Sequence, residues 1–158
     1  MSTLRKGDAP VADRAASRRW SGVDATRSRT MAAVKQGGTE PELEVRSELQ
    51  SLGYRFQVLA RKLPGTPDIV LTSHKVVIFV HGCYWHGHSC PHGKRQSRTN
   101  TDYWLAKIRG NQARDKRNLA ALRKNGWRAL VIWECQIKKR QAMRGRMQKF
   151  LDGKTRRV

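Results

Sequence analysis

The segment IFVHGCYWHGHSC, residues 78–90, carries three histidines and two cysteines. Thiolates and imidazoles are the ligands that zinc prefers, and four of them with no open position are typical of a structural site. A third cysteine follows an apolar run much later in the chain. The sequence therefore predicts one structural zinc site, with the ligands Cys83, His88, Cys90 and Cys135. Spacing alone does not exclude His86 or His92 in place of His88, or three reduced cysteines without metal.

A second set of candidate residues could hydrolyse a bond with the help of a metal. Asp68 follows LPGTP, which predicts a turn, and it precedes an apolar strand, so its carboxylate is expected at an edge of a sheet. His81 ends the next apolar run and His86 lies five residues later. A neutral imidazole beside a metal-binding carboxylate can take a proton from water. The alternatives are a turn-capping aspartate and hydrogen-bonded structural histidines.

Acidic residues number only 12, so each can be weighed. Glu42 is the acid closest to the apolar stripe of the first predicted helix, and Glu48 is the second closest. Glu42 also stands in capping-box spacing with Thr39, so it could serve the helix, the site or both. Asp115 is expected on a helix surface. The role of Glu134, which follows a strand, stays open.

The aromatic residues near the histidines interleave with basic ones. Tyr84 and Trp85 are adjacent in the same loop, and Trp104 follows in TDYWLAKI. Two large adjacent aromatics in such a loop are hard to bury together. Wedging between the base steps of DNA is therefore the functional interpretation, and core packing is the alternative.

The elements that must position these residues can be read from apolar patterns, caps and turn residues. A three-strand meander followed by a helical crossover to a fourth strand makes a mixed sheet. The sequence thus predicts an α/β fold with a mixed sheet of four strands or slightly more, flanked by helices. The run 75–80 is continuously apolar after Lys75, which indicates a strand buried on both faces, and the run 127–133 is expected to be a further buried strand. The predicted order is helix 39–53, strands 54–58, 68–71 and 75–80, helix 102–126, strand 127–133 and helix 137–150.

The length and the net charge of the chain limit its possible domain organisation and binding partners. The 158 residues suit one domain, predicted at 26–150, between a flexible basic arm at 1–25 and a basic tail at 151–158. The 33 lysines and arginines against 12 acids give a formal charge of +21, which favours nucleic acid as the partner. No apolar run resembles a signal peptide or a membrane span, and the odd cysteine count favours a reducing, intracellular location.

Six motifs in collinear order, between about Asp24 and Cys135, together resemble one family. They are ATRSRTM, TEPELEVR, LPGTPDIV, FVHGCYWHGHSC, TDYWLAKI and GWRALVIWEC. These motifs resemble the very-short-patch repair (Vsr) endonucleases, which nick DNA beside T:G mismatches. The resemblance implies a PD-(D/E)xK nuclease-like core with a structural zinc site, and a role in the repair of deaminated 5-methylcytosine.

The resemblance also implies roles for individual residues and two cofactors, catalytic Mg²⁺ and structural Zn²⁺. Asp68 matches the metal-binding aspartate and His86 the catalytic histidine, with His81 and Glu42 as accessory residues. The four predicted zinc ligands match the zinc ligands of the family. The DNA-binding positions are Tyr84, Trp85 and Trp104, which would intercalate from the major groove, and Met31, Arg27 and Arg29 in the arm that reaches the minor groove.

The chain departs from the general nuclease signature, which has an acid near Val80 and a lysine near Gly82. Magnesium would then rely on Asp68, the backbone carbonyl of Val80, waters and phosphate oxygens. Two alternatives remain, a nuclease of the same fold with another DNA target and a non-catalytic, zinc-stabilised DNA-binding module. The expected protein is a cytoplasmic, nucleoid-associated monomer that binds double-stranded DNA with a T:G mismatch, with mismatch-repair proteins as candidate partners and no membrane contact.

Overall fold

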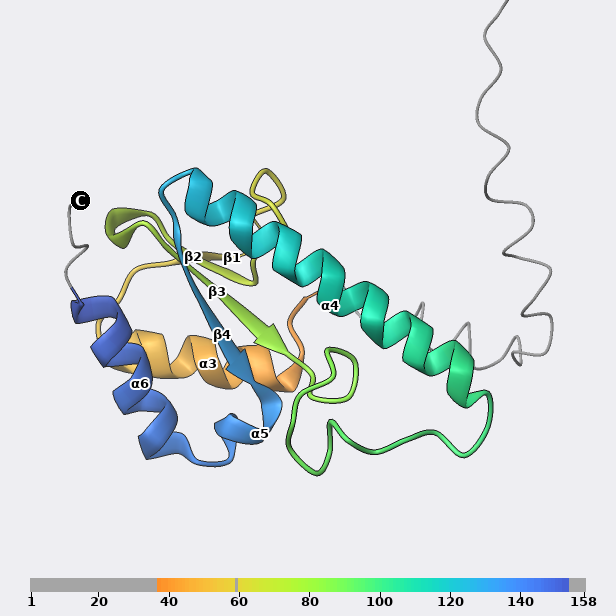
Figure 1. Ribbon diagram of the computed structural model, residues 1–158. Coiled ribbons are helices and arrows are strands. Elements are labelled where there is room, and N and C mark those ends of the chain that lie inside the picture. Colours follow the sequence, from red (N-terminus) through yellow and green to blue (C-terminus); the bar gives the residue numbers. More distant parts are fainter. Residues whose placement is uncertain (1–36, 59, 154–158) are drawn as a thin grey trace, which may run out of the picture. The chain divides into compact units, whose positions relative to one another are not determined.

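The computed structural model describes residues 37–58 and 60–153 (Figure 1). The predicted arm at 1–25 and the predicted DNA contacts Arg27, Arg29 and Met31 lie outside these residues. The helices are α3 (Glu40–Ser51), the 3-10 helix η2 (Thr72–His74), α4 (Thr101–Lys124), α5 (Glu134–Ile137) and α6 (Arg140–Asp152). The strands are β1 (Gln57–Val58), β2 (Ile69–Leu71), β3 (Val76–His81) and β4 (Arg128–Trp133).

The four strands form one mixed sheet in the order β1-β2-β3-β4. β1 with β2 and β2 with β3 pair antiparallel, while β3 and β4 pair parallel, from Val76 opposite Arg128 to His81 opposite Trp133. Helix α4 makes the crossover between the two parallel strands, as parallel pairing requires. The predicted meander, crossover and mixed four-stranded sheet are therefore confirmed.

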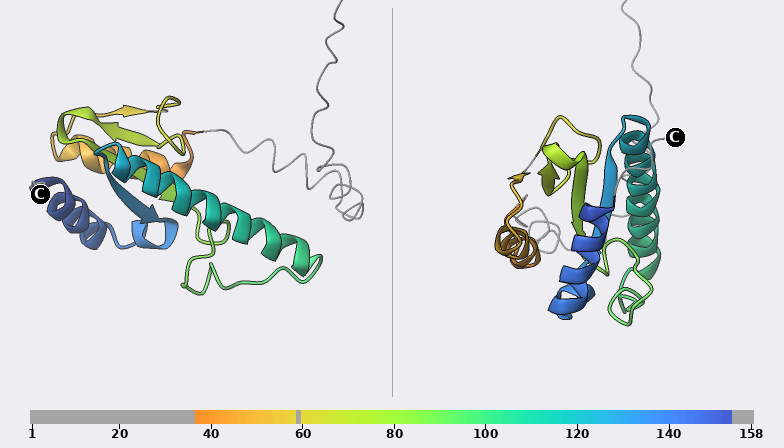
Figure 2. Two further views of the ribbon diagram at one scale, coloured as in Figure 1. Left: turned by 45° about the horizontal axis from the view of Figure 1, so that its top comes forward. Right: turned by 90° about the vertical axis from the view of Figure 1, so that its left-hand side faces the viewer.

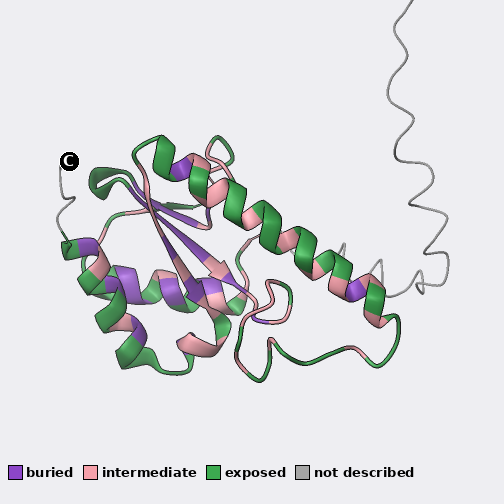
Figure 3. Ribbon diagram, in the orientation of Figure 1, coloured by how far each residue is buried: buried purple, intermediate pink, exposed green. Residues whose placement is uncertain are grey.

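Helices cover both faces of the sheet, with α4 on one face and α3, α5 and α6 on the other (Figures 1 and 2). The face under α4 is packed by a small cluster that includes Val77, Phe79 and Leu122. The opposite face carries the larger core, to which β2, β3 and β4 contribute alternate residues and the three helices add their apolar stripes. Figure 3 shows the buried residues concentrated on the strands and on the inner sides of these helices.

β3 is the strand that the two clusters enclose. All of its residues are buried except Val80, which is half-buried. The prediction of a strand buried on both faces is thus confirmed for β3, whereas β4, predicted as a buried strand, is buried only in part. Only Leu130 and Ile132 of β4 are buried, since β4 forms the edge of the sheet beyond β3.

Two other differences concern element boundaries. The predicted strand 54–58 is reduced to its last two residues, and the predicted final helix is preceded by the separate short helix α5. Helix α6 continues to Asp152, into the predicted tail, because Leu151 belongs to the core of the helical face. Among the described residues, no helix combines the length and the apolar composition needed to span a bilayer.

Candidate active site and metal centre

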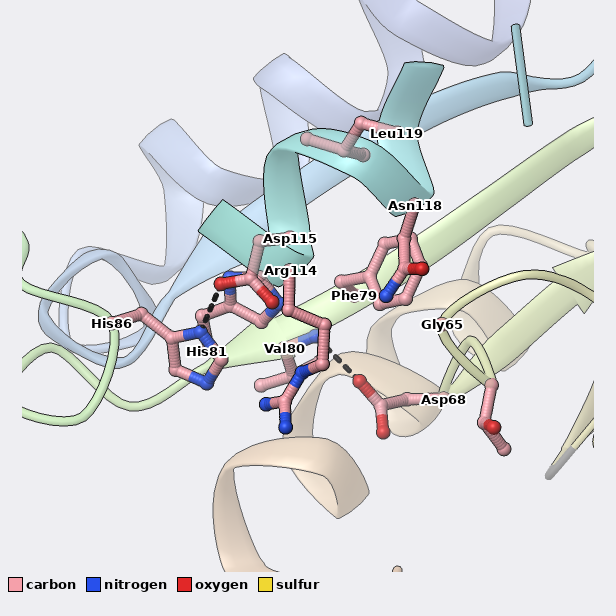
Figure 4. Close-up of a pocket in the computed structure, with 11 residues that line it drawn as sticks. Gly65, Asp68, Phe79, Val80, His81, His86, Arg114, Asp115, Asn118 and Leu119 are labelled. Carbon is pink, nitrogen blue, oxygen red and sulfur yellow. Dashed lines mark hydrogen bonds and ion pairs between the residues drawn. The ribbon is translucent and has the colours of Figure 1, made fainter. Parts of the chain in front are cut away.

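A cleft of about 520 Å³ opens where the carboxyl end of β3 meets α4 (Figure 4). Three elements supply its lining: the turn before β2, the last residues of β3 with the following loop, and one side of α4. Asp68, Val80, His81 and His86, all predicted as site residues, lie together here. The remaining lining residues are Gly65, Thr66, Phe79, Arg114, Asp115, Asn118 and Leu119.

Asp68 is held at the cleft by the neighbouring strand. Its Oδ2 accepts a hydrogen bond of 2.7 Å from the backbone N–H of Val80, and the side chain of Asp68 has no other hydrogen bond within the described ranges. Burial raises the pKa of Asp68 to about 6; the Val80 N–H opposes this shift, and the charge of Glu42 adds to it. A half-buried carboxylate with one oxygen still available is suited to receive a cation.

His86 forms a dyad with Asp115 of α4. The distance from His86 Nδ1 to Asp115 Oδ2 is 2.5 Å, and each side chain is 19% exposed. A carboxylate on one ring nitrogen fixes the ring and favours a proton there, which leaves the other nitrogen free to accept one. The prediction that Asp115 is only a helix-surface acid is therefore wrong. A sequence signal existed, because Asp115 precedes Leu119 and Leu122 by one and two turns on the sheet-facing side of α4.

His81 lies under His86 at the end of β3. The two imidazoles stack with centroids 3.8 Å apart and planes at 10°, and His81 is 8% exposed. The pKa of His81 is lowered to about 4, mainly by burial; nearby His86 acts in the same direction and Asp115 opposes the shift. His81 is consequently neutral near pH 7 and supports the ring of His86 from below.

Glu42 serves the helix cap and an ion pair. Its carboxylate accepts hydrogen bonds from the Gly38 N–H at 2.8 Å and the Thr39 hydroxyl at 2.9 Å, and it pairs with Arg46 at 3.0 Å. The predicted capping interaction is thus present in modified form, since Thr39 contributes its hydroxyl. Glu42 is near enough to raise the pKa of Asp68, but it does not bond to His86.

Glu48 is occupied on the helical face of the sheet. It is 2% exposed and bonds to Arg140 and to Arg144, two cations of α6. Burial acts to raise its pKa, but the two arginines lower it below the usual value. Glu48 therefore joins α3 to α6 and has no part in the cleft.

The four predicted zinc ligands converge beside the cleft. The ligand atoms of Cys83, His88, Cys90 and Cys135 all lie within 4.8 Å of one another. His86 belongs to the dyad and exposed His92 lies outside the cluster, so the ambiguity in the sequence is resolved in favour of His88. Three thiols and one imidazole at this spacing match the donor set of a closed, structural zinc site.

Backbone groups around the cluster favour thiolate ligands. The N–H of Cys135 donates to Cys83 Sγ and the N–H of Gly93 donates to Cys90 Sγ, both at 3.4 Å. Burial raises the pKa of Cys83 to about 12, whereas the bond to His88 lowers that of Cys90 to about 6. A thiol as buried as Cys83 ionises near neutral pH only if a cation compensates its charge, which is what a bound zinc ion does.

Gly93 was not predicted, yet the cluster requires a glycine at this position. A Cβ there would lie 1.9 Å from the backbone oxygen of His88 and 2.9 Å from that of Cys83. No side chain fits at these distances, because both atoms belong to the backbone. Gly93 thus lets the loop close against the backbone of Cys83 and His88.

Trp133 separates the cleft from the cluster. It is paired with His81 across β3 and β4, its ring meets the His81 ring edge-on at 5.4 Å, and His88 stacks on it at 4.3 Å. Cys83 and Cys135 each stand two residues beyond this pair. The parallel register therefore delivers both cysteines to one place.

The aromatic residues form a third surface. Trp85 is 36% exposed and contacts the rings of Tyr84 at 5.0 Å and Trp104 at 5.7 Å. Trp104 itself is 6% exposed. In this arrangement Trp104 supports Trp85 from behind, and DNA contact by all three rings stays a prediction.

Comparison with known proteins places the chain among DNA endonucleases. The family model "DNA mismatch endonuclease Vsr" matches residues 23–92. The type II nicking enzyme V.XorIIP of Xanthomonas oryzae pv. oryzae is 48% identical over 122 residues, covering 77% of this chain and 89% of that protein. The DNA mismatch endonuclease Vsr of Escherichia coli K12 is 41% identical over 119 residues, covering 75% of this chain and 76% of that protein.

The fold is similar to that of a solved nuclease domain. The catalytic domain of the homing endonuclease I-Bth0305I superimposes with a TM-score of 0.50 at 23% sequence identity, covering 72% of this chain and 94% of that domain. At this identity the likeness concerns the fold alone. It supports the prediction of a nuclease-like core.

Proposed function

Because this chain belongs to the Vsr family and is a DNA mismatch nicking endonuclease, we propose that its substrate is duplex DNA with a T:G mismatch. The reaction is hydrolysis of one phosphodiester bond beside the mismatch, as a step in the repair of deaminated 5-methylcytosine. The observation that carries the proposal is the meeting of Asp68, His86 and Asp115 in one open cleft.

The residues present fit the two metals that the proposal requires. Oxygen donors from Asp68 and the carbonyl of Val80 are of the kind that Mg²⁺ prefers, and the available oxygen of Asp68 can receive it. The cluster of three thiols and one imidazole would hold Zn²⁺. Magnesium bound at Asp68 would supply positive charge to the scissile phosphate.

His86 is the general base of the proposed reaction. With Nδ1 directed at Asp115, its Nε2 takes a proton from the attacking water as the water oxygen bonds to phosphorus. The bond from phosphorus to the 3′ oxygen breaks, and that oxygen gains a proton from solvent. The products are a 3′-hydroxyl and a 5′-phosphate. Asp115 stabilises the imidazolium that forms, and buried His81 limits the tilt of the ring.

Recognition of the mismatch is assigned to the aromatic surface. A wobble pair stacks poorly, so inserting an aromatic ring beside it requires less energy than at a Watson–Crick step. Trp85 is the most exposed of the three rings and is backed by Trp104. A monomer suffices because one nick needs one active site; nucleoid association and contact with mismatch-repair proteins belong to the same proposal.

The decisive experiment compares nicking of T:G and T:A duplexes with Mg²⁺. We expect the wild-type protein to nick the T:G duplex at least about 100-fold faster, and the Asp68→Ala and His86→Ala variants to lose at least about 1000-fold in rate. Asp102→Asn, which removes an exposed acid of α4 outside the cleft, is the matched control and should retain full activity. Equal rates on both duplexes would refute the T:G assignment.

A further inference from the structure

The cleft contains one permanently charged cation among its described lining residues, Arg114 of α4. Figure 4 shows its side chain extending from the helix into the cleft, with the guanidinium between His86 and Asp68 in this view. Arg114 is exposed, so a ligand can reach it. Its only hydrogen bond within the described ranges runs from Nη2 to Asn111 Oδ1 at 3.1 Å.

We propose that Arg114 is a catalytic residue that binds the scissile phosphate and stabilises the negative charge of the transition state. This assignment rests on the proposed function and identifies a group that the sequence did not single out. The strand that carries the site has no lysine near Gly82, so the chain lacks a cation at the position where the general nuclease signature has one. Helix α4 supplies a cation to the same cleft from the opposite side.

The charges of the cleft favour such a cation. Asp68 and Asp115 are the acids that line it, and a phosphodiester brings a further negative charge. A cation that contacts the phosphate oxygens therefore offsets repulsion in the complex and stabilises the charge that accumulates during attack.

The geometry of the guanidinium suits this role better than a point charge would. Its five N–H donors form a planar fork that matches two phosphate oxygens. One nitrogen bonds to Asn111, and the side-chain N–H of Asn111 donates at 2.9 Å to the backbone oxygen of Trp85. Arg114 is thus oriented from the loop that carries the aromatic surface, while its other donors face the cleft.

The test separates catalysis from DNA affinity. Single-turnover nicking of the T:G duplex with Mg²⁺, at saturating enzyme, is measured for Arg114→Ala, Arg114→Lys and the control Arg117→Ala. Arg117 is an exposed cation of α4 that does not line the cleft. DNA affinity without divalent ions is measured in parallel. We expect Arg114→Ala to slow nicking about 100- to 1000-fold, Arg114→Lys to be intermediate, and Arg117→Ala to stay within about 5-fold of wild type.

A second experiment, chemical rescue by guanidinium, does not depend on the Arg117→Ala control. Guanidinium chloride below its denaturing range, compared with sodium chloride at equal ionic strength, should restore part of the rate of Arg114→Ala and none of the rate of Asp68→Ala. Equal rates for Arg114→Ala and Arg117→Ala would overturn the assignment of Arg114 and leave the proposed function intact. A wild-type protein that nicks no T:G duplex would overturn both.

Discussion

The metal cluster and the cleft share the loop that follows β3, but their donor atoms are arranged in opposite ways. In the cluster, the ligand atoms of Cys83, His88, Cys90 and Cys135 face one another within 4.8 Å, and backbone N–H groups bond to two of the sulfurs. In the cleft, Asp68 has one oxygen available and Arg114 is exposed. A closed set of donors stabilises structure, whereas an open set can receive a substrate.

The difference shows how the ten residues 81–90 can contribute to the cleft, the metal cluster and the aromatic surface at once. His81 and His86 turn toward the cleft, Cys83 and His88 toward the cluster, and Trp85 toward solvent. A zinc ion bound by Cys83, His88 and Cys90 would fix the loop, and the loop would then hold His86 in the cleft and Trp85 at the surface. Changes in the cluster should therefore affect stability, while changes in the cleft should affect activity and leave the fold intact.

The largest expected effect follows from loss of the cluster. We expect purified protein to contain one zinc ion per chain. Cys83→Ser should lose the metal and most of its stability, because structural zinc contributes on the order of 10 kcal/mol to the folding of small zinc domains. Elemental analysis and thermal unfolding measure both. His92→Ala, which changes the exposed histidine outside the cluster, is the control and should keep its zinc. Wild-type protein that is stable and free of zinc would contradict the closed-site interpretation.

A smaller loss is expected from Gly93→Ala. The added Cβ would collide with the backbone oxygen of His88, so the loop must move away from the cluster, at a cost of about 2–3 kcal/mol in the free energy of unfolding. Gly110→Ala in α4 is the matched control. Its Cβ would meet nothing within 4 Å, and alanine in a helix should add about 0.5–1 kcal/mol. Chemical denaturation measures the free energy of unfolding of both variants. Equal stability of Gly93→Ala and Gly110→Ala would show that the loop does not need a glycine at position 93.

The smallest effect has the opposite sign and belongs to the cleft. Burial raises the pKa of Asp68 to about 6 from an ordinary value of 3.8, so the folded protein binds more protons than the unfolded chain between these values. Stability then falls as the pH rises through this window, and the loss is complete above about pH 6. Without Mg²⁺, Asp68→Asn should be more stable than wild type at pH 8 by about 1–3 kcal/mol.

The pH dependence distinguishes this cause from a general change in packing. The advantage of Asp68→Asn should shrink as the pH falls from 6 toward 5, because wild-type Asp68 becomes protonated in the folded state. Denaturation curves at several pH values without divalent ions measure it. The Asp102→Asn control, which removes an acid from the first turn of α4, should differ from wild type by the same small amount at every pH in this range. An advantage of Asp68→Asn that does not vary with pH would exclude the buried charge as its source.

Local sequence patterns were sufficient to predict most of the fold and about half of the residues of the candidate site. Pro41 and Gly53 bound α3 as predicted, and the unbroken apolar run of β3 reflects a strand enclosed by two clusters. Residue types and short spacing were sufficient to predict Cys83 and Cys90 as zinc ligands. Asp115 was missed because polar neighbours on α4 concealed its position one turn before Leu119, and Arg114 was hidden in a chain rich in basic residues.

The sequence by itself determined the chemistry that is available: soft ligands for zinc, a carboxylate at a strand start, imidazoles at a strand end and a strongly basic surface. Tertiary structure decided which groups meet. The parallel register that sets His81 opposite Trp133 brings Cys135 to Cys83 across 52 residues, and the crossing of α4 over β3 gives His86 its partner Asp115. Such contacts depend on strand register and helix placement, which arise from packing of the whole core and leave little trace in local sequence.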